Sequence, residues 1–196
     1  MIRKVSISAL LLFSLVPVLG GCASQYVVLE NVAHHRLFPN GVYKHKVKLT
    51  IVSNGTSPEK KFSFDGVVQL SDESIRVVVL SFFGTTMLKI NDNLKTGELQ
   101  TEVFLPQIKK FEPKLRDYYS ILKLVLIMSA TRPDDSGKIV WTKVNDKGLP
   151  LELKTSAQDK EVSFKFENYD KADIPEEVSL THPTFKAEIK VTGYEI

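Results

Sequence analysis

The sequence predicts a mainly β domain of the α+β class, built as an antiparallel barrel or a strongly curved sheet with one helix. Roughly ten short segments alternate apolar and polar residues with a period of two, and turn residues separate them at regular spacing. One segment, 113–130, repeats its apolar residues every three or four positions instead. Behind its N-terminal leader the chain has the length of one domain, which is enough to bury a core.

The N-terminus has the pattern of a lipoprotein signal peptide. Arg3 and Lys4 precede an apolar run, 5–18, that is too short to span a bilayer. The run leads into Leu19-Gly20-Gly21-Cys22, which resembles a bacterial lipobox. In that motif the cysteine thiol takes a diacylglycerol and the peptide bond before it is cut. We therefore expect Cys22 to be lipidated; the alternative is an ordinary signal peptide followed by a cysteine buried in the core.

Lipidation would hold the mature chain on a membrane outside the cytoplasm, because two or more acyl chains anchor a protein stably. Ala23 stands where the inner-membrane retention signal of enteric bacteria has Asp. In a Gram-negative cell we therefore expect the periplasm-facing side of the outer membrane. The expected division of the chain is a cleaved signal peptide over 1–21, a lipidated lead-in over 22–40 and a folded domain over 41–196.

Charge and cysteine content exclude several classes of partner. Of the 26 basic residues, Arg3 and Lys4 lie in the leader, and the remaining 24 nearly balance the 23 acidic residues. A near-neutral domain without a basic cluster argues against nucleic-acid binding. A single cysteine allows no disulfide within the chain. We expect a monomer that is held together by its core alone.

The first half of the domain contains five expected strands. The first has an apolar face and a basic face that carries Lys44, Lys46 and Lys48. These lysines either meet anionic head groups near the anchor or form an ordinary solvated sheet face. Turn residues follow each strand, including Asn54-Gly55 and Asn91-Asp92-Asn93. The expected strands are 42–51, 61–70, 75–80, 87–90 and 97–103.

The link between the third and fourth strands has an unusual composition for a turn. Turns normally carry Gly, Asn, Asp, Ser or Pro, but here Phe82 and Phe83 precede Gly84. Exposed aromatic rings at a tip cost solvation free energy unless something covers them. The sequence therefore indicates a tip that contacts a membrane; the alternative is that one or both rings fold back and close the end of the barrel.

The second half begins with the expected helix, 113–130. Pro113 suits a first helical turn and Pro133 forbids continuation. The run 121–128 is apolar nearly all round except for Lys123, so the helix should be largely buried or cover an apolar cavity. A partly buried strand is the alternative here. The expected strands after it are 138–144, 149–155, 161–168, 177–181 and 185–192.

The placed strands resemble those of LolB-like outer-membrane lipoproteins, which receive acylated cargo in the lipoprotein-sorting pathway. The resemblance lies in Phe64-x-Gly66, in Ser81-Phe82-Phe83-Gly84-Thr85, and in the stretch from Val162 through Tyr169 to Leu180. In that family the tip reads Asn-Pro-Leu-Gly, so Phe83 takes the Leu position and Phe82 stands where Pro does. The resemblance implies an incomplete antiparallel β-barrel around an apolar cavity with a helical lid. A branch of the family with another lipid as cargo fits the same motifs.

On this basis we expect a lipoprotein that binds acyl chains and helps to transfer them to the outer membrane, with the tip touching the bilayer. Its partners would be the membrane, an acyl-chain ligand or lipoprotein cargo, and a periplasmic carrier. A filled core is the alternative to an open cavity, and a tethered scaffold subunit is the alternative to a carrier. The residues expected to line the cavity are apolar and point inward: Phe64, Val68, Val79, Trp141, Phe164, Phe166, Leu180 and Ile189.

The sequence shows no pattern typical of catalysis. Its four histidines, His34, His35, His45 and His182, have no metal-binding spacing. It has no Gly-x-Ser-x-Gly turn for a nucleophile and no glycine loop for a phosphate. We therefore expect a protein that is not an enzyme and that uses no cofactor and no metal.

Overall fold

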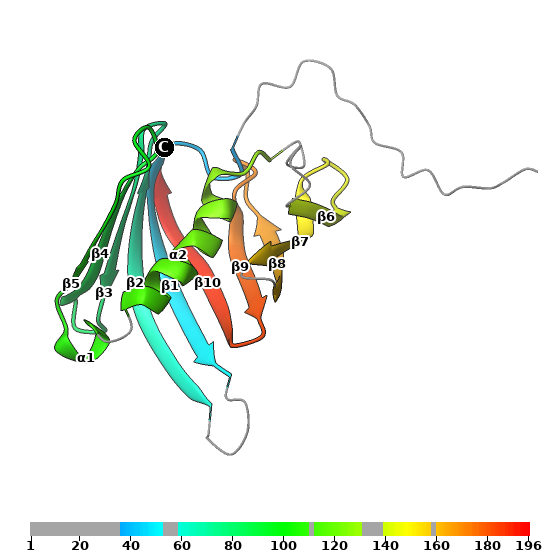
Figure 1. The fold of residues 1–196 in the computed structure, drawn as a ribbon. Coiled ribbons are helices and arrows are strands. Elements are labelled where there is room, and N and C mark those ends of the chain that lie inside the picture. Colours follow the sequence, from blue (N-terminus) through cyan, green and yellow to red (C-terminus); the bar gives the residue numbers. More distant parts are fainter. Residues whose placement is uncertain (1–35, 53–58, 110–111, 131–138, 158–159) are drawn as a thin grey trace, which may run out of the picture. The chain divides into compact units, whose positions relative to one another are not determined.

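Two runs of antiparallel strands meet where the first and last strands of the chain pair with each other (Figure 1). The computed structural model describes residues 36–52, 59–109, 112–130, 139–157 and 160–196, which all lie in one compact unit, Val32–Ile196. The predicted signal peptide, Cys22 and most of the predicted lead-in therefore lie outside the described residues.

The first run folds as a meander in which each strand pairs with the next. Its strands are β1 (Gly41–Ile51), β2 (Lys60–Leu70), β3 (Ser74–Leu80), β4 (Thr86–Asn93) and β5 (Leu99–Val103). Two helices follow, α1 (Pro106–Lys109) and α2 (Glu112–Ile127). The sequence did not predict α1: Pro106 ends the strand before it, and the same residue also opens a short helix, where proline is favoured.

The second run is a meander that returns to the start of the chain. Its strands are β6 (Ile139–Val144), β7 (Pro150–Ala157), β8 (Lys160–Tyr169), β9 (Pro175–His182) and β10 (Phe185–Glu195). The strand order of the whole sheet is β5-β4-β3-β2-β1-β10-β9-β8-β7-β6, and all pairs are antiparallel. Within the described residues β5 and β6 remain the two edges, so the sheet is open. The predicted α+β class with an incompletely closed antiparallel sheet is confirmed.

The β1–β10 pair joins the two meanders and contains a bulge. His45 faces Val191 and Lys44 faces Gly193, so Thr192 is the extra residue. The Thr192 hydroxyl donates a hydrogen bond to the Lys44 carbonyl at 3.1 Å, which satisfies a backbone group that the bulge removes from the ladder. Bulges bend a strand and increase its twist, so this one adds curvature at the centre of the sheet.

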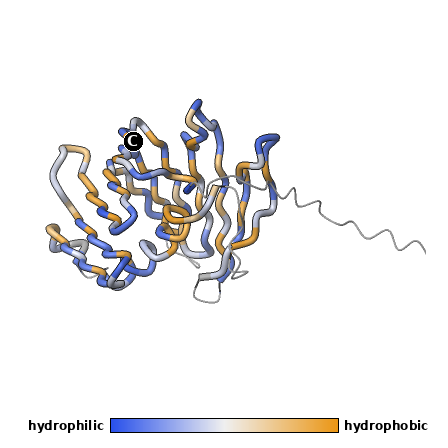
Figure 2. The backbone as a smooth tube through the Cα atoms, turned by 90° about the horizontal axis from the view of Figure 1, so that it is seen from above, coloured by the Kyte–Doolittle hydropathy of each residue, from blue (hydrophilic) through white to orange (hydrophobic). Residues whose placement is uncertain are grey.

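Alternating side chains give the sheet one apolar face, which carries α2 (Figure 1). Figure 2 shows apolar and polar residues alternating along the strands. On β8, for example, Val162, Phe164 and Phe166 are buried while the residues between them are not. The Tyr118 ring of α2 lies 4.4 Å from that of Phe185 on β10. We call this side the helix face; the opposite side is largely charged.

The end of the predicted lead-in belongs to this core. Leu37 and Phe38 are buried, and the Leu37 amide donates a hydrogen bond of 3.0 Å to the carbonyl of Met128, just after α2. Arg36 forms an isolated β-bridge with Ser129. The chain therefore enters the domain at the C-terminal end of α2. Neither described helix is long and apolar enough to cross a membrane.

Candidate functional site: the β3–β4 tip and the helix face

The β3–β4 hairpin holds its tip in a defined conformation. The Ser81 amide donates to the Thr85 carbonyl at 2.8 Å, and the Gly84 amide donates to the Ser81 carbonyl at 2.9 Å. The Thr85 amide also donates to the Ser81 hydroxyl oxygen at 3.1 Å. Gly84 has a φ of 76°, in the left-handed region that glycine adopts without steric cost. These contacts fix the two residues between Ser81 and Gly84 in one arrangement.

Those two residues are Phe82 and Phe83, and both point into solvent. Their side chains are 87% and 89% exposed, and their rings pack edge to face with centroids 5.5 Å apart. The alternative in which a ring folds back onto the sheet is not what the structure shows. Within the part of the chain that the structure describes, each ring has only the other as a ring partner, and two adjacent phenylalanines this exposed form an apolar projection that is typical of an interaction site.

More apolar surface lies near the same end of the sheet. Phe104 is partly exposed, its amide donates to the carbonyl of Met87 near the start of β4, and Lys89 lies over its ring at 5.2 Å. Phe62 is also partly exposed, on the part of β2 that extends past the last pair with β3. The tip is therefore the most exposed part of an aromatic rim that also carries lysine side chains.

The eight residues predicted to line a cavity all lie on the helix face, where they are buried to different degrees. Val68, Phe164, Phe166 and Leu180 are fully buried in the core. Val79, Trp141 and Ile189 are half-buried and pack against that core, and Phe64 is half-buried at the open end of β2. The strand pairs show that these residues lie in both halves of the sheet. Phe164 is paired with Leu180 in the second meander, and Val79 is paired with Gly66 in the first.

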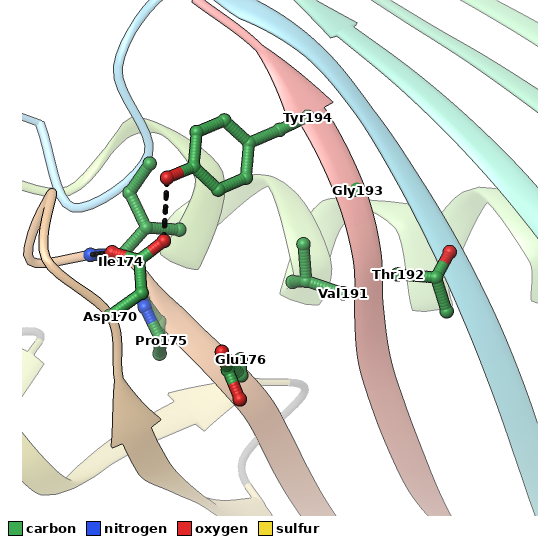
Figure 3. A pocket seen from close by; sticks show the side chains of 8 residues that line it. All are labelled: Asp170, Ile174, Pro175, Glu176, Val191, Thr192, Gly193 and Tyr194. Carbon is green, nitrogen blue, oxygen red and sulfur yellow. Dashed lines mark hydrogen bonds between the residues drawn. The ribbon is translucent and has the colours of Figure 1, made fainter.

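Two pockets among the described residues contain none of those eight side chains. One, of about 150 Å³, lies between the start of β9 and the end of β10 (Figure 3). There the Tyr194 hydroxyl donates to the Asp170 carboxylate at 2.6 Å. Burial opposes ionisation of Asp170, but this bond and two backbone amides lower its pKa. The other pocket, of about 190 Å³, is lined mainly by polar residues of β3, β4 and β5. The Asp170 contacts close the β8–β9 turn, which is a structural role.

A buried polar cluster that the sequence did not predict fixes α2 to β4. The Asp92 carboxylate accepts a hydrogen bond of 2.7 Å from the Tyr119 hydroxyl and lies 2.8 Å from the Lys123 ammonium. Burial, followed by the bond to Asp92, raises the pKa of Tyr119 and keeps its hydroxyl protonated. The available signal was Lys123, the single charge in an otherwise apolar helical run. A buried charge is stable only with a partner.

The structure places two of the four histidines, and they lie apart on the helix face. His45 on β1 and His182 on β9 are both buried, while His34 and His35 fall outside the described residues. Within the described ranges, no three His, Cys, Asp or Glu side chains come together in a way that could hold a metal ion.

No protein-family model matches the sequence, and no curated protein matches it. Among solved structures, the chain is similar to a crystal structure from Vibrio parahaemolyticus named as a candidate outer membrane lipoprotein-sorting protein domain. The TM-score is 0.43 and the sequence identity is 7%. The match covers 79% of this chain and 85% of that one.

Proposed function

We propose that this protein is a lipid-anchored envelope protein that binds acyl chains on its helix face and passes them to a membrane through the β3–β4 tip. The proposed role is binding and transfer without catalysis, at the periplasm-facing side of the outer membrane. The lipobox supports the anchor, and the resemblance of the strand and tip motifs to LolB-like lipoproteins supports the cargo class. The single observation that carries the proposal is the exposed Phe82–Phe83 pair.

The tip contributes enough apolar surface to matter at a bilayer. Moving a phenylalanine side chain from water to an apolar environment is worth roughly 1.5–3 kcal/mol, so the pair is worth roughly 3–6 kcal/mol. The rings are already held outward by the hairpin contacts of Ser81, so little conformational entropy is lost on insertion. An anchored protein with such a tip touches the bilayer at a second point, which brings the helix face close to the lipid.

Acyl binding requires space beneath α2, because the strongest wall candidates are packed as core. The side chains of Phe164 and Phe166 are buried in the core, and their rings stack with centroids 6.4 Å apart. A chain of CH₂ groups would take the place of α2 contacts at roughly 0.8 kcal/mol per buried CH₂. Movement of α2 is therefore part of the proposal.

The burial of Phe164 and Phe166 also favours a second candidate, a non-catalytic scaffold subunit that uses the same tip to hold a partner protein. Its apolar tip would then dock into a pocket of that partner instead of a bilayer. The two candidates differ in what the tip needs: the scaffold requires no space under α2 and no lipid transfer.

A transfer assay separates them. The full lipidated chain in donor vesicles of phosphatidylethanolamine and phosphatidylglycerol is mixed with acceptor vesicles, and transfer of a pyrene-labelled phospholipid is followed by loss of excimer fluorescence. We expect the wild-type chain to accelerate transfer. The transfer rate of the Phe82→Ser/Phe83→Ser double variant should be lower by at least about tenfold. Val140→Ser is the matched control, because Val140 is an exposed apolar residue on the edge strand β6.

The outcomes are distinct. Transfer by the double variant at the wild-type rate would exclude the tip as the membrane contact. Absence of transfer with the wild-type chain, together with a co-purifying protein that the double variant loses, would replace the carrier with the scaffold.

A further inference from the structure

Three buried polar atoms on the β6–β9 half of the helix face have no hydrogen-bond partner in the described part of the chain. They are Trp141 Nε1, Thr155 Oγ1 and His182 Nε2. The Thr155 and His182 residues are only 6% and 5% exposed. A buried polar atom without a partner costs roughly 1–3 kcal/mol, so native proteins rarely leave several close together. This group therefore indicates a polar site inside an apolar surface.

Strand register places Trp141 next to Thr155, and places His182 two strands from Thr155 and three from Trp141. Trp141 lies opposite Leu153, two residues along β7 from Thr155, so Trp141 and Thr155 are diagonal neighbours, roughly 7–8 Å apart. Thr155 pairs with Val162 on β8, and the next residue of β8, Ser163, pairs with Thr181 on β9, which directly precedes His182. His182 is thus two strands from Thr155, about 10 Å. The residues between them, Leu153 and Val162, are buried and apolar.

The hydrogen bonds of His182 indicate whether its unpartnered Nε2 is a donor or an acceptor. The Thr184 amide donates to His182 Nδ1 at 3.2 Å, and the Thr184 hydroxyl, 2.8 Å from the same nitrogen, can donate to it as well, so Nδ1 is an acceptor. Burial, followed by the charge of Lys160, lowers the pKa of His182, which favours the neutral ring. In a neutral imidazole with Nδ1 accepting, the proton is on Nε2. His182 Nε2–H and Trp141 Nε1–H are then both donors, and the Thr155 hydroxyl can donate as well.

We propose that Thr155 and its diagonal neighbour Trp141 donate the two hydrogen bonds to the carbonyl oxygen of an acyl ester or amide, with His182 as a third polar group beside the site. A carbonyl oxygen accepts two hydrogen bonds and carries no net charge, which matches neutral donors in an apolar setting; a charged head group would cost more to bury. The apolar residues around the site hold the start of the acyl chain. The site rests on the proposed acyl-binding function and names the ligand group that it recognises.

The site also contacts α2 through one aromatic residue. The Phe185 ring lies 5.0 Å from the His182 ring and 4.4 Å from the Tyr118 ring of α2. A ligand that enters at His182 therefore meets the contact between α2 and β10. This places the carbonyl site at the margin of the region that α2 covers.

The test uses the full chain in dodecyl maltoside, a detergent without a carbonyl group. Three probes are compared: methyl palmitate labelled with ¹³C at the carbonyl, N-methylpalmitamide, and hexadecane, which has no carbonyl. We expect the carbonyl resonance of bound ester to shift as it accepts hydrogen bonds, and the indole N–H resonance of Trp141, the single tryptophan, to shift with it. The ester and amide arms distinguish phospholipid-like or glyceride cargo from an N-acylated protein terminus.

The Thr155→Val variant removes one hydroxyl at constant shape. We expect it to bind methyl palmitate roughly two- to tenfold more weakly while its affinity for hexadecane stays unchanged. Thr101→Val is the matched control, because Thr101 Oγ1 is also buried without a partner but lies on β5, at the opposite edge of the sheet. Both variants remove an unpartnered buried atom and should fold at least as stably as the wild type.

Equal affinities for methyl palmitate and hexadecane, or equal losses in the two variants, would overturn the carbonyl site and leave acyl binding intact. Failure of all three probes to bind would instead overturn the proposed function, and the carbonyl site with it. A shift of the Trp141 indole resonance with methyl palmitate and not with hexadecane supports the site directly.

Discussion

The contact between Asp92 and Lys123 gives the sharpest quantitative prediction, because it fixes α2 to β4 inside the core. The Asp92 side chain is 3% exposed and that of Lys123 is 30% exposed. Lys123→Met keeps the aliphatic stem and removes the ammonium, which leaves the carboxylate with the Tyr119 hydroxyl as its remaining partner. Removing one partner of a buried ion pair costs roughly 3–5 kcal/mol, and the partial exposure of Lys123 places this pair at the lower end, about 3 kcal/mol.

Urea unfolding followed by circular dichroism at pH 7 measures this loss. With an m-value of about 2 kcal/mol per molar urea, the midpoint should fall by about 1.5 M. The matched control is Lys190→Met, since Lys190 lies 3.3 Å from Glu177 in an exposed pair. Exposed pairs are worth roughly 1 kcal/mol or less. The double variant Asp92→Asn/Lys123→Met removes both charges, keeps an amide oxygen that can accept from the Tyr119 hydroxyl, and should recover most of the lost stability.

The reasoning would be refuted if Lys123→Met lowered the midpoint no more than Lys190→Met does. It would also be refuted if the double variant were less stable than Lys123→Met, because the cost would then come from packing and not from an unpaired charge. Hydrogen exchange adds a local test: the α2 amides should exchange faster in Lys123→Met if the pair holds the helix on the sheet.

Three further variants test separate features. Gly84→Ala should lower the free energy of unfolding by about 1 kcal/mol, because alanine is strained at a φ of 76°. No atom lies within 4 Å of the new Cβ, so the backbone conformation alone causes the loss. Thermal unfolding measures the loss, and an unchanged melting temperature would contradict the prediction. Burial lowers the pKa of His45 from 6.5 to about 4 in the folded chain. Between these two pH values the unfolded chain therefore binds more protons than the folded chain. The contribution of His45 to the free energy of unfolding is complete above about pH 6.5 and is lost as the pH falls. His45→Leu should remove roughly 2.5 kcal/mol of the wild-type difference between pH 7 and pH 4.5 in urea unfolding, whereas equal differences would refute it. Tyr169→Phe removes the bond that the Tyr169 hydroxyl donates to the Pro150 carbonyl and should cost about 1 kcal/mol in the same assay.

The strands could be predicted because each has one apolar and one polar face. The last expected strand, 185–192, is the first eight residues of β10, and 161–168 lies within β8. The periodicity comes from which face is buried, so it survives any error in the local turn assignment. Strand order does not follow from periodicity. That β1 pairs with β10 depends on contacts between the two ends of the domain, which no local pattern encodes.

Asp92 shows where local composition misleads. Asn91-Asp92-Asn93 has the composition of a turn, yet these residues end β4, and Asp92 continues the buried positions Leu88 and Ile90. The alternation was present in the sequence, but a carboxylate at an inward position makes sense only with a cation opposite it. That cation comes from α2, which is distant in sequence. A tertiary ion pair therefore decided the structure against the local preference.

The same limit applies to the helix face. An inward apolar residue such as Phe164 has one sequence pattern whether it fills a core or lines a cavity, and only the position of α2 decides between the two. In this structure α2 lies on the sheet and Phe164 is core. The free energy that holds α2 in place therefore sets the cost of admitting a ligand. Moving α2 away would separate Lys123 from Asp92, and leaving Asp92 buried without its partner costs about 3 kcal/mol, which roughly four buried CH₂ groups would offset. An acyl chain of ordinary length has several times that number, so its burial would offset the loss of this contact.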